Sequence, residues 1–237
     1  MYYYIHTDGM YQKKGDTTQM ARNKYPEETI QKILDVSYRL FLEKGYEHTS
    51  IQDIVHAIGM SKGAIYHHFK SKDEILERIC EQYYSDIQWL DDILQDSSLN
   101  SLEKLKKIYY YELNDEKKRS YDIIALPMLK NPNMIVMQLQ EAIHETGPLL
   151  TKLIEEGNAD GSMHVKYPRQ LAETMILLVN IWISPGCIPV SRDDFFKKIL
   201  FYQDMLENLG LPLIDGKFVN VCMGYYDAVF SSVSWDT

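Results

Sequence analysis

The stretch MSKGAIYHHFKSK, at residues 60–72, gathers side chains that are suited to binding nucleic acid. It carries Gly63, Tyr66 and two adjacent histidines, with lysines at positions 62, 70 and 72. Lysine and tyrosine can hold phosphate oxygens, while histidine can face base edges. Glycine costs roughly 1 kcal/mol relative to alanine inside a helix, but its missing Cβ lets the backbone approach a phosphate. The combination therefore indicates contact with phosphates and bases.

The residues before this stretch predict two helices that would hold it in place. The first is expected over residues 26–44, because apolar or small side chains recur there at helical spacing and Gly45 follows as a stop signal. These positions are Ile30, Ile33, Leu34, Ser37, Tyr38 and Phe41. The second is expected between Thr49 and Gly59, with Thr49 as the N-cap and Gln52 completing a capping box. Gly59 is expected to end it in a left-handed conformation.

The third expected helix contains the stretch itself and begins after Ser61, which serves as its N-cap. Ile65 and Phe69 are four residues apart and would face the core, so the other side chains from 62 to 68 must point elsewhere. A fourth helix is expected from Ser71, capped with the help of Glu74, and running to about residue 94.

Three short helices with a tight turn between the second and third describe a helix-turn-helix, whose third element lies in the DNA major groove. The sequence FLEKGYEHTSIQDIVHAIGMSKGAIYHHFKSKDEIL resembles the DNA-binding domain of the TetR family of transcriptional regulators over about residues 26–76. The resemblance implies DNA contacts at Ser50, Gln52, Ser61, Lys62, Gly63, Ala64, Tyr66, His67, His68 and Lys72.

Interpretations of the same residues that involve no DNA remain open. The tyrosine and the two histidines could form a surface cluster, and Lys70 and Lys72 could be solvated charges. Adjacent histidines point about 100° apart on a helix and have no third ligand at a useful spacing, so no metal is expected.

Beyond residue 96 the pattern is helical throughout, with no alternation typical of strands and no internal repeat. Helices are expected at about 101–114, 121–130, 133–156, 168–184, 191–209 and 217–230, and Pro148 should kink or break the third of these. The expected fold is all-α. A flexible tail at 1–24 precedes a helix-turn-helix domain at 25–72 and a ligand-binding and dimerisation domain at 73–237. Translation could begin at Met20.

The larger part resembles the family in architecture, through LLTKLIEEGNADGSM followed by YPRQLAETMILLVNIW. This resemblance implies an all-helical domain that dimerises and often holds a small molecule. Helices 168–184 and 191–209 are the expected dimer helices. An apolar stripe on the second is interpreted as the interface, although it could also pack inside its own subunit. The stripe comprises Phe195, Ile199, Tyr202, Met205, Leu206 and Leu209.

Aromatic and sulfur-containing side chains are the usual material of a ligand pocket among helices. The candidates here are Trp89, Tyr109, Tyr110, Met128, Met134, Met137 and Trp182. The alternative for each of them is a place in the plain core. Nothing in the pattern identifies the ligand.

The net charge of −9 argues at first against a nucleic-acid partner. Its distribution is uneven, however, because residues 1–72 hold ten Lys and Arg against eight Asp and Glu, and the remaining residues carry the acidic excess. The longest apolar run, at 175–183, is too short to cross a bilayer, and no signal peptide is recognisable, so a cytoplasmic location is expected. Cys80, Cys187 and Cys222 are expected to be free thiols.

The function expected from these features is a ligand-responsive repressor that binds a palindromic operator as a homodimer. The sequence holds no G-x-x-x-x-G-K, G-x-S-x-G, H-E-x-x-H or G-x-G-x-x-G motif, so neither an enzyme nor a cofactor is expected. A transcriptional activator, or a DNA-bound structural or cell-division factor without a ligand, remains an alternative. The effector and the operator are unknown.

Overall fold

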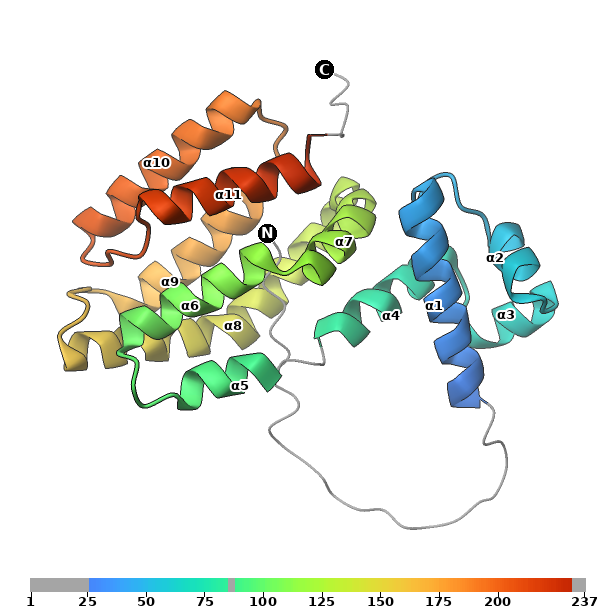
Figure 1. The fold of residues 1–237 in the computed structure, drawn as a ribbon, viewed down its shortest axis with the longest axis horizontal. Coiled ribbons are helices and arrows are strands. Elements are labelled where there is room, and N and C mark those ends of the chain that lie inside the picture. The colour runs from blue at the N-terminus through green and yellow to red at the C-terminus, as the bar shows by residue number, and fades with distance from the viewer. Residues whose placement is uncertain (1–25, 85–87, 232–237) are drawn as a thin grey trace, which may run out of the picture. The chain divides into compact units, whose positions relative to one another are not determined.

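The computed structural model of the chain describes residues 26–84 and 88–231. The expected tail at residues 1–24 and the possible start at Met20 lie outside the described residues. All regular structure within the described residues is helical, which confirms the expected fold class (Figure 1). Contacts divide the chain into two compact units, whose described parts are residues 26–84 (the N-terminal unit) and 88–231 (the C-terminal unit).

The N-terminal unit consists of α1 (Pro26–Lys44), α2 (Ile51–Ile58), α3 (Lys62–His68) and α4 (Lys72–Tyr84). Helix α1 packs against α2 and α4, and α2 packs against α3. Each helix contributes fully buried isoleucine, leucine or phenylalanine side chains, among them Ile33, Ile54, Ile65 and Ile75. Because α4 belongs to this compact unit, the unit extends beyond residue 72, and the expected domain boundary at 72/73 stays a prediction.

The C-terminal unit contains seven α-helices among its described residues, together with a short 3₁₀-helix and a π-helix. In chain order they are α5 (Gln88–Gln95), α6 (Ser101–Asn114), α7 (Glu116–Ala125), the 3₁₀-helix η2 (Leu126–Lys130), α8 (Pro132–Asp160), α9 (Pro168–Leu177), the π-helix η3 (Leu178–Ile183), α10 (Arg192–Asn208) and α11 (Gly216–Val229). Helix α8 packs along α9 and α6, and α11 packs on α6, α7 and α10. One apolar core joins α6, α8, α9, α10 and α11.

Several helices differ from their expected extents. The described part of the fourth expected helix reaches Tyr84, and α5 is described from Gln88. Helix α7 begins at Glu116 because the Asp115 side chain accepts a hydrogen bond from Lys117 N at 2.8 Å, which caps the helix earlier than periodicity indicates. Helix α9 ends at Leu177 and not near residue 184 as expected, because the chain continues as a π-helix from residue 178.

Pro148 was expected to kink or break the long helix, but α8 runs continuously through it from residue 132 to 160. Proline removes one backbone hydrogen bond from a helix, and packing can offset that loss. The neighbouring Gly147 lies close to α9. A Cβ built on Gly147 would lie 3.8 Å from Ile176 Cδ1. The side chains of Thr146 and Leu150 are also buried. Tertiary packing on both sides of the proline holds the helix together.

Four of the six residues of the α10 stripe pack inside their own unit, so the interpretation of these four as a dimer interface was wrong. Of the other two, Met205 is partly exposed and Leu209 is 48% exposed. Phe195, Ile199, Tyr202 and Leu206 are all less than 5% exposed in the single chain. They face the hydrophobic core that α10 shares with α11 and η3. The sequence pattern located an apolar face correctly, but periodicity alone cannot say whether the covering surface is the same chain or a second copy.

The three cysteines are free, as expected.

Candidate nucleic-acid interface

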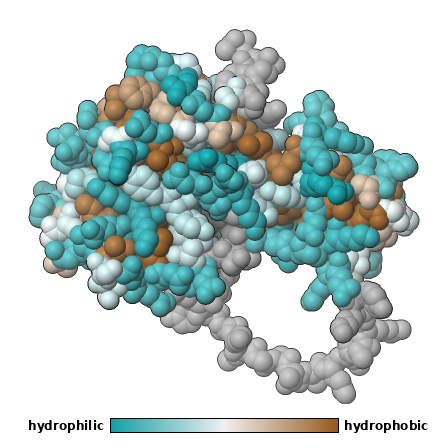
Figure 2. Space-filling view, viewed as in Figure 1, coloured by the Kyte–Doolittle hydropathy of each residue, from teal (hydrophilic) through white to brown (hydrophobic). Residues whose placement is uncertain are grey.

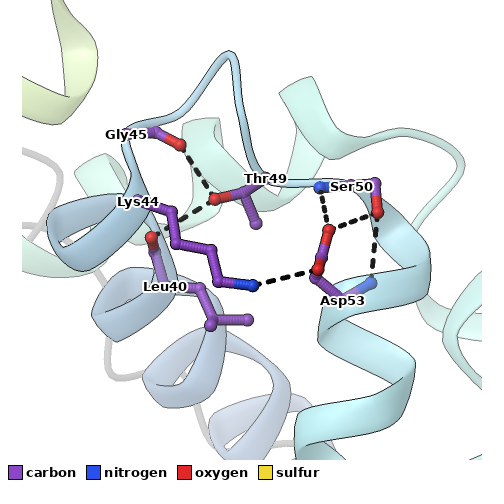
Figure 3. Close-up of polar contacts among 6 residues, drawn as sticks. All are labelled: Leu40, Lys44, Gly45, Thr49, Ser50 and Asp53. Carbon is purple, nitrogen blue, oxygen red and sulfur yellow. Dashed lines mark hydrogen bonds and ion pairs between the residues drawn. The ribbon is translucent and has the colours of Figure 1, made fainter.

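The beginning of α2 is held by a capping box one residue later than expected (Figure 3). Ser50, not Thr49, is the N-cap: its Oγ accepts from Asp53 N at 3.2 Å, and the Asp53 carboxylate accepts from Ser50 N at 2.9 Å. Gln52 takes no part in the box and is exposed. The sequence is ambiguous here because Thr49 and Ser50 are both good capping residues.

Thr49 instead ties the loop before α2 to the end of α1 (Figure 3). Its side chain is buried, and its Oγ1 lies 2.8 Å from Gly45 O and 3.2 Å from Leu40 O. Lys44 Nζ lies 3.0 Å from Asp53 Oδ1, which joins the last turn of α1 to the first turn of α2. Hydrogen bonds from Ser50, followed by the bond and charge of Lys44, lower the pKa of Asp53 well below its ordinary value. The capping carboxylate therefore stays ionised at neutral pH.

A left-handed glycine sets the turn between α2 and α3. Gly59 has φ 72°, as the sequence predicts, and its N–H donates to Val55 O at 3.0 Å. Ser61 then caps α3 by accepting from Ala64 N at 3.2 Å. Ile65 is fully buried and Phe69 is 5% exposed, which confirms them as the inward pair. The orientation of α3 is thus set by one cap and two apolar anchors.

The outward side of α3 carries most of the residues that the resemblance assigns to DNA. Lys62, Gly63, Tyr66 and His67 are exposed and span about 140° of the helix surface at 100° per residue. Ala64 and His68 border this arc and are partly exposed. Ser50, Gln52 and Ser61 are exposed at the beginnings of α2 and α3. We call these nine residues the α3 face; their contact with DNA stays a prediction.

Gly63 is not needed for packing within the chain. A Cβ added to it would meet no atom within 4 Å, and its backbone is not left-handed. The space in front of its Cα is therefore open. A helical glycine that faces open space at a helix N-terminus suits a close approach by a phosphate, since backbone N–H groups point outward there.

Two ring contacts order the polar side chains of α3. The Lys62 ammonium lies 5.7 Å from the centroid of the Tyr66 ring, within range of a cation–π interaction. The rings of His67 and His68 meet edge to face at 5.1 Å. Both contacts reduce the rotamer freedom that binding would otherwise have to remove.

Lys72 is more constrained than a solvated lysine. Its Nζ donates to Tyr46 O at 2.7 Å and lies 4.0 Å from the centroid of the Tyr46 ring. The Tyr46 hydroxyl donates to the Asp73 carboxylate, and burial followed by that bond raises the pKa of Tyr46 far above its ordinary value. One of three ammonium hydrogens is used, so a phosphate contact remains open. Lys72 also has a structural role that sequence reasoning missed.

The seven predicted pocket residues do not gather at one place. Tyr109 lines both of the cavities described for the C-terminal unit, and the other six line neither. Trp89 stacks on Tyr111 at 4.1 Å, Tyr110 OH lies 3.2 Å from Asp215 Oδ1, and Trp182 packs edge to face with Phe201. Met137 is 62% exposed, and Met128 and Met134 are partly exposed.

Among the described residues, no three His, Cys, Asp or Glu side chains are grouped so that they could hold a metal ion. No helix in the described ranges is both long and apolar enough to cross a membrane.

A family model described as "Bacterial regulatory proteins, tetR family" matches residues 33–79, from the middle of α1 through most of α4. Residues 33–79 therefore have the sequence of the DNA-binding domain of the TetR family. Among solved structures, a TetR-family regulatory protein from Rhodococcus RHA1 has a TM-score of 0.51 at 20% identity, over 78% of this chain and 98% of that one. That likeness shows a shared fold across both units.

Curated relatives of this chain include the uncharacterized regulator YvaF of Bacillus subtilis, 36% identical over 78 residues. That match covers 32% of this chain and 40% of YvaF, so the chain spans less than half of that relative. The repressor KstR2 of Mycolicibacterium smegmatis is 25% identical over 175 residues, which cover 65% of this chain and 78% of KstR2. The matches agree on a helix-turn-helix of the kind that transcriptional regulators carry.

Proposed function

We propose that this chain is a TetR-family regulator that represses transcription by binding a palindromic operator as a homodimer, and that a small molecule releases it. The observation that carries the proposal is the α3 face: it presents polar and basic side chains outward while Ile65 and Phe69 anchor the helix from behind. A recognition helix must present its polar side chains this way if they are to enter the major groove.

The direction of regulation is supported by the names of relatives. KstR2 is named a transcriptional repressor, and IcaR of Staphylococcus aureus is named a negative regulator of a biofilm operon. Response to a small molecule is supported by two proteins of the same fold, one described as a gamma-butyrolactone receptor and one solved in complex with choline. These statements concern those proteins, and they make repression and an effector the working proposal for this chain.

Dimerisation is supported by four large apolar side chains that are exposed on α9 and α10. Leu177 is 43%, Phe196 39%, Leu200 38% and Phe201 57% exposed, although all are large apolar side chains. We call these four residues the α9–α10 face. Hydrophobic side chains also lie among the hydrophilic ones on the face of the chain drawn in Figure 2. A second copy covering the α9–α10 face would give a dimer with two recognition helices, and a dimer that binds one duplex reads half-sites about 34 Å apart or a multiple of that.

The proposal is tested by selecting bound duplexes from a random pool with the purified full chain. We expect the selected sites to have two-fold symmetry, and their affinity to fall steeply with salt, since Lys62, Lys70 and Lys72 would displace counterions from phosphates. Enrichment of no sequence, or of single half-sites alone, would reject binding to a palindromic operator. Transcription from a promoter that overlaps the selected site then separates repression from activation.

A DNA-bound structural factor without a ligand remains the alternative, because it would use the same α3 face. The two proposals differ in the C-terminal unit. A regulator loses operator affinity when some small molecule binds there, whereas a structural factor keeps it across a metabolite and drug panel.

A further inference from the structure

The larger of the two described cavities lies wholly within the C-terminal unit. Its walls come from α6, η3, α10 and α11, together with the loop after η3 and the segment at 211–214. About 500 Å³ of space inside it, counted with its opening, is not filled by atoms. The wall includes Leu113, Val179, Phe195, Phe218 and Tyr225. Part of it is a π-helix, a local irregularity that is frequent at functional sites.

The wall of this cavity offers no counterion to a charged molecule. No Asp, Glu, Lys, Arg or His occurs among the lining residues drawn from the described chain. Burial also raises the pKa of the lining thiol of Cys222 to about 12, so that group is neutral. An ion moved from water into such surroundings without a counterion loses several kcal/mol of solvation. The cavity therefore selects against charged molecules.

One polar atom in the wall lacks a partner. The Tyr202 side chain is 3% exposed, and its hydroxyl makes no hydrogen bond within the described chain. The wall has two other tyrosines, Tyr109 and Tyr225, and the Tyr225 hydroxyl donates to Asp122 Oδ2 at 2.6 Å. A buried hydroxyl without a partner is costly, and a ligand that accepts its hydrogen bond removes that cost.

We propose that this cavity binds an uncharged, largely apolar molecule whose carbonyl or ether oxygen accepts a hydrogen bond from Tyr202. This inference rests on the proposed regulatory function, for which the molecule is the effector. It names the chemical class of effector and the residue that orients it.

The cavity also has a defined connection to a neighbouring helix. Tyr225 contributes its ring to the wall, and its hydroxyl reaches the buried pair on α7, where Lys118 Nζ lies 2.7 Å from Asp122 Oδ2. A ligand that displaces the Tyr225 ring must disturb this buried ion pair. We therefore expect ligand binding in the cavity to be transmitted to α7.

The test uses four probes with the same number of non-hydrogen atoms and nearly the same shape: acetophenone, isopropylbenzene, benzoate and 1-phenylethylammonium. Binding to the full chain is measured by calorimetry or ligand-observed NMR in the absence of DNA. We expect acetophenone to bind about tenfold more tightly than isopropylbenzene, the contribution of one hydrogen bond of about 1.4 kcal/mol. We expect the two charged probes to bind at least tenfold more weakly than acetophenone.

Two variants assign the site. Tyr202→Phe should reduce acetophenone binding to the level of isopropylbenzene and leave isopropylbenzene unchanged. Thr146→Val is the matched control, because Thr146 Oγ1 is also buried without a partner but lines the smaller second cavity. It should leave both affinities unchanged. A cooperative thermal transition for each variant establishes that it folds.

The proposal is overturned if a charged probe binds best, if no probe binds, if Tyr202→Phe leaves the preference for acetophenone intact, or if Thr146→Val removes it instead. DNA binding without any probe is measured separately. Its loss would reject the proposed function, whereas failure of the probe series with DNA binding intact rejects the effector class alone.

Discussion

At the scale of single residues, Gly63 is a position where helix stability favours alanine and DNA binding favours glycine. Nothing within the chain lies near its Cα, so alanine would fit without displacing a neighbour. Alanine is also the better helix former by about 1 kcal/mol. A glycine whose replacement should stabilise the helix is best explained by what approaches it from outside.

We therefore expect Gly63→Ala to raise the free energy of unfolding of the N-terminal unit by up to about 1 kcal/mol. The added methyl group would obstruct the phosphate, so we expect operator affinity to fall about tenfold or more. Denaturant titration and fluorescence anisotropy measure the two effects. Unchanged affinity in the more stable variant would remove Gly63 from the interface.

Lys72 and Lys70 form a matched pair for testing phosphate contacts. Lys72→Ala should weaken binding to all sequences and shallow the slope of log affinity against log salt by about one unit. Because Lys72 also donates to Tyr46 O, this variant should lose stability, whereas Lys70→Ala should not. Affinities are therefore compared at temperatures well below both thermal transitions. A changed sequence preference with an unchanged slope would contradict the phosphate role of Lys72.

At the scale of elements, the helix-turn-helix was predictable because its signals are local. Gly59 and Ser61 set the turn and the cap, and the pair Ile65 and Phe69 set the buried side. The error at the beginning of α2 was one residue, between Thr49 and Ser50. Only the buried bonds of Thr49 to the end of α1, a tertiary feature, decide between those two residues.

The C-terminal unit was less predictable because its decisive contacts join helices that are distant in the sequence. Periodicity placed α6 at its observed bounds, but it could not place Tyr225 of α11 against Asp122 of α7. It could not show that Pro148 lies in a helix braced by α9. The cavity lining, assembled from several helices and loops, had no signature in any one of them.

The buried charges between α6, α7 and α11 lead to a pH prediction. Glu112 is 5% exposed, and burial raises its pKa from 4.5 to about 7, against the opposing attraction of Lys118. The folded chain therefore holds a proton that the unfolded chain has released between about pH 4.5 and 7. Stability must fall as pH rises through that window, and the loss persists above it.

We expect Glu112→Gln to remove this fall, because glutamine does not titrate. At pH 8 the variant should be more stable than the parent by up to about 3 kcal/mol, and the two should converge near pH 4.5. Denaturant melts across pH 4.5 to 8 measure the difference. Glu116→Gln, at an exposed position on α7, is the control and should leave the profile unchanged. Parallel profiles for Glu112→Gln and the parent would contradict a proton held on Glu112.

At the scale of the whole molecule, the net charge of −9 is compatible with DNA binding because affinity depends on the local surface that meets the phosphates. A single α3 face reads only a few base pairs, so specificity for one operator requires a second copy. The two requirements are carried by different units: the α3 face lies in the N-terminal unit and the α9–α10 face in the C-terminal unit. Damage to one surface should leave the other intact.

Phe201→Glu tests this separation, because it places a charge on the most exposed residue of the α9–α10 face without disturbing the buried side of α10. We expect the variant to be monomeric by analytical ultracentrifugation, since burying an unpaired carboxylate in an apolar interface costs several kcal/mol. Affinity for a full palindrome should fall about a hundredfold, because the second half-site no longer benefits from being tethered to the first. Affinity for a single half-site should not change. Met137→Glu adds the same charge at a position that is 62% exposed on α8, outside this face, and should remain dimeric. A dimer that survives Phe201→Glu, or a half-site affinity that falls in step with that for the palindrome, would place the contact between copies elsewhere on the chain.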